Sequence, residues 1–270
     1  MGDIKLVWIR AMASARHTRK AFDSDLQNLS RLLAEMGELA ETQVENAVEA
    51  LASGDRERAR RLIAADCAID TMQRTIDEKV VELIARRQPV AVDLREALGI
   101  LRIANELERI GDLAKNIGKR IPAIPGKHLI RRSTPAVRSM GLDIARQLGA
   151  ALDGFAHRDF VTALDVWVRD AEIDQVCTTI SRDLLACMAE DPDAVMYGIH
   201  LLFCAKNLER IGDHATNIAE SVHYMVKGQV IPGERPKADL TCIGAPHLGA
   251  LKEVALKSSH PHGHYRQRVG

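Results

Sequence analysis

The hexapeptide Leu-Glu-Arg-Ile-Gly-Asp occurs twice in this chain without a change, at residues 107–112 and 208–213. The longer stretches around it, 104–117 and 205–218, agree at 10 of 14 positions. Further upstream, residues 65–70 align with 169–174 three positions out of register, and this length change falls at a predicted turn, where insertions are tolerated. A repeat of this size indicates that one supersecondary unit has been duplicated, so the fold must accommodate two similar halves.

Apolar residues recur at helical spacing almost everywhere before about residue 228, and strand-like alternation is nearly absent. Asp55 and Asp159 are placed to cap the starts of two helices, and Ser53-Gly54 and Gln88-Pro89 break the pattern between helices. These signals predict six helices, at about 26–53, 55–87, 91–119, 134–156, 159–190 and 193–228.

We therefore expect an all-α fold made of two tandem, similar three-helix bundles, six long helices in total, with a C-terminal tail. Two separate cores, one in each bundle, are the simplest arrangement. The predicted boundaries are an N-terminal extension at 1–20, the first bundle at 21–120, a proline-rich linker at 121–134, the second bundle at 135–228 and a flexible tail at 229–270.

Composition restricts the possible functions. Lys and Arg number 37, the same as Asp and Glu, so the net charge gives no attraction to nucleic acid or to bulk anionic membrane. The five cysteines are scattered and form no C-x-x-C pair, which favours reduced, buried thiols in a soluble, cytoplasmic protein. No P-loop, dinucleotide-binding, zinc-protease or nucleophile-elbow motif is present, so no motif supports a catalytic role.

The repeated hexapeptide contains two acidic residues four positions apart, which lie on the same side of a helix. That side is roughly opposite the apolar stripe of the same helix. The second helix of each half carries a matching acidic pair, so two neighbouring helices should bring four carboxylates together. These are Asp66, Asp70, Glu108 and Asp112 in the first half, and Asp170, Asp174, Glu209 and Asp213 in the second.

Like charges at this spacing repel, so a sequence that keeps them together usually places something positive between them. Carboxylate oxygens suit hard divalent or ferric ions, and helical bundles can hold di-metal carboxylate clusters. The alternative is a solvated acidic face that Arg109 and Arg210 neutralise. His214 follows Asp213, but Leu113 stands at the equivalent place, so His214 is at most an extra ligand in one half.

Two further features bear on metal binding. Gly111 and Gly212 lie inside helices, where glycine costs about 1 kcal/mol relative to alanine, so their repetition indicates close helix approach or room beside the acidic pair. The tail sequence HPHGH at 260–264 could bind transition metals, although a disordered terminus with fortuitous histidines is the favoured interpretation.

With ERIGD in both halves, RRQPVAVDLR at 86–95 and YMVKGQ at 224–229, the chain resembles the PhoU family of phosphate-transport regulators over about residues 17–229. The resemblance implies two similar three-helix bundles, often in a homodimer, with iron or zinc clusters in some members. Carried onto this chain, the E/D-x-x-x-D metal ligands would be the eight carboxylates named above.

The resemblance also implies a regulator without enzymatic activity. PhoU-like proteins are expected to restrain phosphate uptake and the phosphate-starvation (Pho) response. They would relay the state of the Pst transporter, through its ATPase subunit (PstB), to a sensor histidine kinase (PhoR), and so meet the membrane only through partners. Two other interpretations remain open: a metal-storage bundle or metal-dependent phosphate enzyme, and a structural dimerising bundle with solvated acidic faces.

Overall fold

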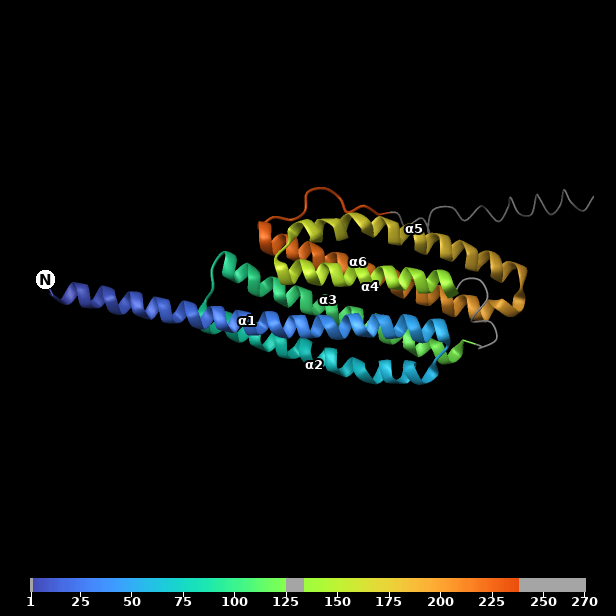
Figure 1. Ribbon diagram of the computed structural model, residues 1–270, viewed down its shortest axis with the longest axis horizontal. Helices are drawn as coiled ribbons and strands as arrows, with labels where there is room; N and C mark the ends of the chain where they lie inside the picture. Colours follow the sequence, from blue (N-terminus) through green and yellow to red (C-terminus); the bar gives the residue numbers. More distant parts are fainter. Residues whose placement is uncertain (1, 125–133, 238–270) are drawn as a thin grey trace, which may run out of the picture.

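The computed structural model describes residues 2–124 and 134–237, with side chains from residue 21 onward, and these ranges contain helices and no strand (Figure 1). The six α-helices are α1 (Gly2–Ser53), α2 (Arg56–Arg87), α3 (Val92–Arg120), α4 (Thr134–His157), α5 (Phe160–Glu190) and α6 (Val195–Lys227). Two 3-10 turns, Ile121–Ala123 and Pro192–Ala194, follow α3 and precede α6. The predicted all-α class with six long helices is confirmed.

The helices begin and end close to where the capping residues predict. The Asp55 side chain accepts hydrogen bonds from the backbone amides of Glu57 and Arg58, both at 2.9 Å, and Asp159 accepts one from Val161 at 2.9 Å. Such bonds satisfy amides that have no partner within the helix. One boundary differs from the sequence pattern: α1 already starts at Gly2, so residues 2–20 continue that helix and extend past the bundle (Figure 1).

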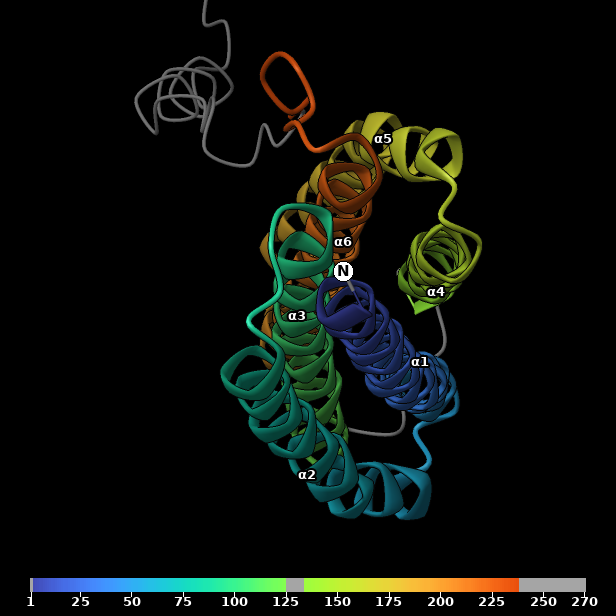
Figure 2. The same ribbon diagram turned by 90° about the vertical axis from the view of Figure 1, so that its left-hand side faces the viewer.

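The two halves pack side by side along their length. Helix α2 packs on α1 and α3, and α5 packs on α4 and α6. The halves meet through the pairs α1–α4 and α3–α6. Viewed from the end, α2 and α5 therefore lie at opposite extremes with the other four helices between them (Figure 2).

The buried apolar residues form a single cluster to which all six helices contribute. The stripe residues Leu107, Ile110 and Ile117 of α3, and their counterparts Leu208, Ile211 and Ile218 of α6, are completely buried. The expectation of two separate cores is therefore wrong. Because α3 packs directly against α6, and α1 against α4, the apolar faces that each half would bury alone are shared.

A polar contact also joins the halves. Glu106 of α3 accepts hydrogen bonds from His214 Nδ1 at 2.6 Å and from Asn217 Nδ2 at 3.0 Å, both on α6. Burial alone would raise the pKa of Glu106, but these two hydrogen bonds hold the pKa below its usual value of 4.5. We call this three-residue contact the inter-repeat clamp.

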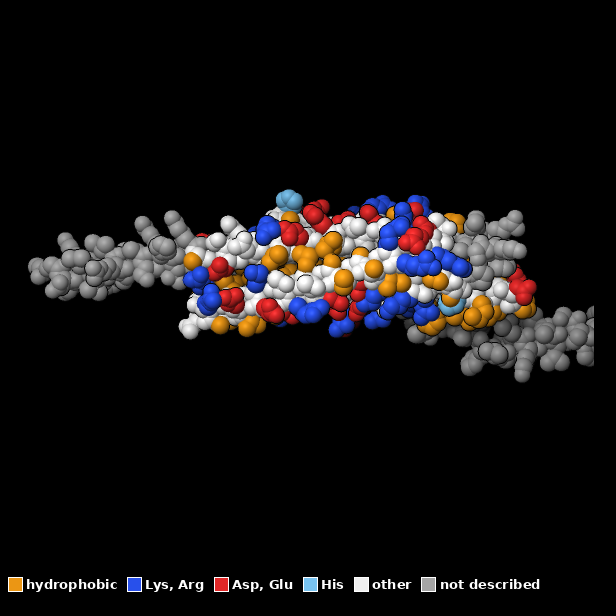
Figure 3. All heavy atoms as spheres, turned by 90° about the horizontal axis from the view of Figure 1, so that it is seen from below, with side chains coloured by type: hydrophobic (Ala, Val, Ile, Leu, Met, Phe, Trp, Pro, Cys, Tyr) orange, Lys and Arg blue, Asp and Glu red, His pale blue; other side chains and the backbone are white. Residues whose placement is uncertain are grey.

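The surface carries intermingled charges of both signs, with apolar side chains visible between them on the face shown in Figure 3. No helix in the described ranges has an apolar stretch long enough to cross a membrane.

Of the cysteines in these ranges, Cys177 and Cys204 are buried, and burial raises the pKa of Cys204 to about 12. Cys67 is exposed, so the expectation of buried thiols is wrong there. Cys242 and the sequence 260–264 lie outside the described residues.

Candidate cation-binding sites

The first acidic site lies between α2 and α3, where Asp66 and Asp112 converge on one basic side chain. Lys115 Nζ donates to Asp112 Oδ1 at 2.5 Å and also hydrogen-bonds Asp66 Oδ2. The Asp66 side chain is only 5% exposed, and its other oxygen, Oδ1, is buried without a hydrogen-bond partner. Burial opposes the charge on Lys115, but the two carboxylates raise the pKa of its ammonium group.

The other two carboxylates of the first site lie within electrostatic range. Partial burial raises the pKa of Glu108, Arg109 opposes this effect, and the negative charges of Asp112, Asp70 and Asp66 add to it. Arg109 Nε is 3.4 Å from Glu108 Oε2, and its side chain is mostly exposed. The first four predicted residues therefore form one acidic neighbourhood, as the spacing indicated.

Gly111 makes room beside this site. A Cβ atom at that position would lie 3.3 Å from Asp66 Oδ1 and 3.1 Å from Ile69 Cδ1, which is closer than ordinary packing allows. The same addition at Gly212 would meet nothing nearer than 3.5 Å. The prediction that these glycines create room beside the acidic pair therefore holds for Gly111, whereas Gly212 has ordinary space around it.

The second acidic site lies between α5 and α6, where Asp170 and Asp213 converge on an arginine from beyond α6. Arg235 Nε donates to Asp170 Oδ2 at 2.8 Å, and Nη2 donates to Asp213 Oδ1 at 2.8 Å. Lys237 Nζ adds a second contact to Asp213 Oδ1 at 2.6 Å. Burial alone would lower the pKa of Arg235, but Asp170 and Asp213 raise it. The guanidinium thus joins the two helices through their carboxylates.

The remaining residues of the second site lie one helical turn away from this pair. Asp174 and Glu209 are 2% and 6% exposed, so both are buried. Lys206 Nζ lies 2.7 Å from Glu209 Oε2. The structure therefore brings Asp170 and Asp213 together around Arg235, and it places the buried Asp174 and Glu209 one turn further along the same two helices.

Metal binding can be tested against this geometry. In residues 21–124 and 134–237, no group of three or more His, Cys, Asp or Glu side chains is arranged to hold a metal ion. In each site two carboxylates converge, and in the first site one of their oxygens, Asp66 Oδ1, has no hydrogen-bond partner and is the kind of atom that a hard cation prefers. In this structure the paired carboxylates instead hold the positive charge of Lys115 in the first site and of Arg235 and Lys237 in the second. His214 Nδ1 is bonded to Glu106, so an extra ligand from this residue would have to be its Nε2.

Sequence reasoning missed these three basic residues. Lys115 could have been found, since it lies three positions after Asp112 and so on the same side of α3. Arg235 and Lys237 gave no such signal, because they follow the repeated region and come to Asp213 only through the path of the chain. The prediction that something positive separates the acidic pairs still describes both sites.

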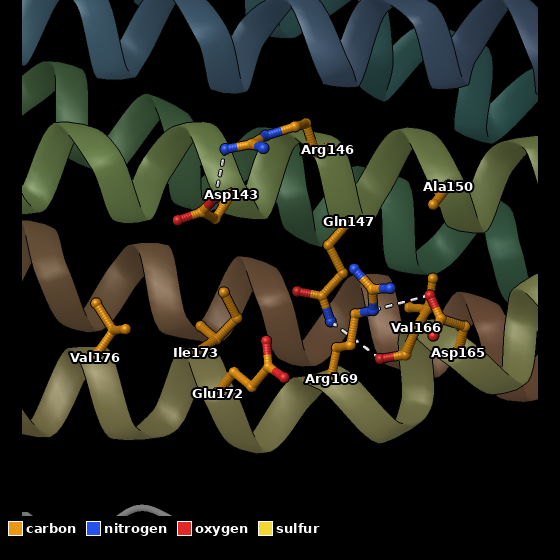
Figure 4. A pocket seen from close by; sticks show the side chains of 10 residues that line it. All are labelled: Asp143, Arg146, Gln147, Ala150, Asp165, Val166, Arg169, Glu172, Ile173 and Val176. Carbon is orange, nitrogen blue, oxygen red and sulfur yellow. Dashed lines mark hydrogen bonds and ion pairs between the residues drawn. The ribbon is translucent and has the colours of Figure 1, made fainter.

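A pocket of about 290 Å³ lies between α4 and α5, next to the second site (Figure 4). Its arginines are paired on their own helices, Arg146 with Asp143 at 2.5 Å and Arg169 with Asp165 at 2.9 Å. Gln147 connects the pocket to the site, because its Nε2 donates to Thr216 Oγ1 at 3.1 Å and that hydroxyl lies 3.0 Å from Asp170 Oδ1. Because the lining carries side chains of both charges, it shows no preference for an anion or a cation.

The chain resembles known proteins over most of its length. The PhoU domain model matches residues 33–121 and again residues 137–222. A phosphate-specific transport system accessory protein PhoU homolog of Rhizobium meliloti is 46% identical over 84% of this chain and 96% of the relative. The one from Caulobacter vibrioides is 42% identical over 83% and 97%. The crystal structure of PhoU from Pseudomonas aeruginosa is 38% identical, with a TM-score of 0.73 over 77% of this chain and 100% of that chain.

Proposed function

Since this chain belongs to the PhoU family, we propose that it is an accessory regulator of a phosphate transport system, and that it restrains phosphate uptake when phosphate is plentiful. The observation that carries the proposal is the double match to the PhoU domain, at 33–121 and 137–222, in a chain whose relatives are phosphate-specific transport system accessory proteins. Each match contains one copy of the LERIGD motif and the acidic site built on it.

The regulator acts as an adaptor in the phosphate-starvation response, between the ATPase subunit of the transporter (PstB) and the sensor histidine kinase (PhoR). Two features support this role. The duplicated halves present two similar acidic sites, and a surface of mixed charge offers polar contacts of either sign to partner proteins. A homodimer of this chain would double these surfaces again.

The acidic sites are also proposed to take iron or zinc when Lys115 or Arg235 moves aside. Asp66 and Asp112, with Asp70 and Glu108 nearby, would hold the ion in the first half. Asp170 and Asp213, with Asp174 and Glu209, would do so in the second half. A bound ion would supply a concentrated positive charge that joins two helices.

Metal content tests this part directly. Untagged protein purified without chelator should contain iron or zinc by plasma-emission analysis. The variant with Glu108, Asp112, Glu209 and Asp213 all replaced by alanine should lose it. Absence of stoichiometric metal from the wild type would contradict the metal proposal and leave the regulatory proposal standing.

The regulatory proposal is tested in cells that lack the gene. We expect such cells to take up labelled phosphate faster than the parent strain in phosphate-rich medium, and to recover normal uptake when the chain is supplied again. Uptake that does not change on deletion would overturn the proposed function. Uptake measured in phosphate-poor medium serves as the control, because the restraint is proposed to act only when phosphate is plentiful.

A further inference from the structure

The chain turns back over the second half after α6 ends. Gly228 closes the helix in the left-handed conformation, with φ of 74°, and His223 Nδ1 lies 3.0 Å from the carbonyl oxygen of Gln229. Residues 229–237 then run alongside α5 and α6 (Figure 1). We call these residues the return segment. They place Arg235 between Asp170 of α5 and Asp213 of α6. The segment comes directly after α6 in the sequence, so its contact to Asp170 joins it to a second helix.

One difference between the halves explains why the second site is neutralised by an arginine from outside the helices. Lys115 neutralises the first site from within α3, and the aligned residue of α6 is Thr216. Thr216 hydrogen-bonds Asp170 but carries no charge. Asp170 is 1% exposed, and a buried carboxylate without a cation is strongly unfavourable. Arg235 therefore supplies in the second half the charge that Lys115 supplies in the first.

The return segment is anchored mainly at this end. Between Val230 and Arg235 it borders a hollow of about 740 Å³, lined also by Trp167 and Tyr224, instead of packing tightly on the helices. Val230 is 77% exposed, so apolar burial there contributes little. Arg235, by contrast, is 17% exposed and makes contacts to Asp170, Asp213 and Asn217. Loss of the ionic contacts should therefore release the whole segment.

We propose that the return segment is a built-in ligand of the second acidic site, and that its Arg235 and Lys237 compete with divalent cations for Asp170 and Asp213. The segment lies beyond the end of the second PhoU domain match at residue 222, whereas Asp170 and Asp213 lie within that match. A cation that enters the second site must displace the segment, whereas in the described residues the first site is neutralised by Lys115, which belongs to α3 itself. The inference rests on the proposed cation binding and adds a regulated occupant to one of the two sites.

Mn²⁺ is a suitable probe because it prefers oxygen ligands, so the imidazoles of His260, His262 and His264 interfere less than they would with zinc. Free Mn²⁺ is counted by electron paramagnetic resonance during titration of the full, metal-stripped chain. If the segment occupies its site about nine-tenths of the time, the apparent Kd of that site is raised about tenfold. The double variant Arg235→Ala with Lys237→Ala should therefore bind Mn²⁺ about tenfold more tightly at one site.

The matched control is Arg169→Ala, which removes an exposed arginine of α5 that pairs with Asp165. Its titration should match the wild type. Circular dichroism of each variant checks that the helices are intact, because the double variant leaves the buried Asp170 carboxylate without its cation. Equal Mn²⁺ binding by the wild type and the double variant, including no binding by either, would overturn the proposal.

Hydrogen exchange gives a second readout that does not depend on the strength of metal binding. Amides of the return segment should exchange faster in Arg235→Ala with Lys237→Ala than in the wild type, and saturating Mn²⁺ should accelerate them in the wild type. Exchange rates in 229–237 that respond to neither change would also overturn the proposal. The Mn²⁺ titration and the hydrogen exchange test the return segment alone, whereas the uptake assay tests the regulatory function.

Discussion

Gly111 and Gly212 occupy the same place in two identical hexapeptides, yet their surroundings differ. At Gly111 a methyl group would press on Asp66, which Lys115 holds in place, and on Ile69, which is completely buried. At Gly212 the nearest atoms lie at ordinary contact distance. Sequence identity therefore does not predict equal tolerance to substitution, because the second helix that faces each glycine is different.

We predict that Gly212→Ala stabilises the protein by up to about 1 kcal/mol through better helix propensity. Gly111→Ala should be less stable than Gly212→Ala, because strain at Asp66 and Ile69 offsets that gain. Urea unfolding of the two variants and the wild type measures the difference. Equal stabilisation by both substitutions would show that the first site has room to spare.

Lys115→Ala should destabilise the protein by about 2 kcal/mol, because it leaves the buried Asp66 carboxylate without its cation. The loss is smaller than for a fully buried pair, since Asp112 is 35% exposed and can be solvated. Lys119→Ala, one turn further along α3 and exposed, is the matched control and should change little. Adding Asp66→Asn to Lys115→Ala should recover part of the lost stability in the same unfolding experiment.

At the level of helices, the sequence predicts boundaries well and contacts between helices poorly. Caps such as Asp55 and Asp159 act on their own backbone, so local chemistry places the helix ends. The shared core, the clamp at Glu106 and the path of the return segment depend on which helices become neighbours. An apolar stripe shows that a face is buried but does not identify the helix that covers it.

The inter-repeat clamp makes a prediction about pH. The folded-state pKa of Glu106 is below the ordinary value of 4.5, so its stabilising effect is complete above that value. The effect is lost as pH falls through the lower pKa of the folded state. Glu106→Gln should therefore lower the melting temperature near neutral pH, and the difference from wild type should shrink in more acidic buffer. A difference that stays constant across the range would contradict this account of the clamp.

For the whole molecule, one core shared by both halves predicts a single cooperative unfolding transition. Trp167 of α5 reports the second half by fluorescence once Trp8, the only other tryptophan, is replaced by phenylalanine. Far-ultraviolet circular dichroism reports all helices together. The two denaturation curves should coincide. Separate midpoints would show that the halves unfold independently and that each has its own core, as the repeat alone suggested.

The eight acidic residues could be chosen from sequence because the repeat marks them twice, and both sites lie between the helices that the repeat predicts. The basic residues that neutralise these sites could not be chosen in the same way. Lys115 occurs in the first half and is replaced by Thr216 in the second, and Arg235 comes from outside the repeat. The central claim is that these acidic sites serve regulation and are not simply charged surface. A phosphatase reporter of the phosphate-starvation response tests it most directly.

The reporter is measured in phosphate-rich medium, in cells that carry wild type, Glu108→Ala with Asp112→Ala, or Glu209→Ala with Asp213→Ala. We expect both variants to weaken repression while their circular dichroism stays near that of the wild type. Full repression by both folded variants would contradict the account and make the acidic faces structural or solvated.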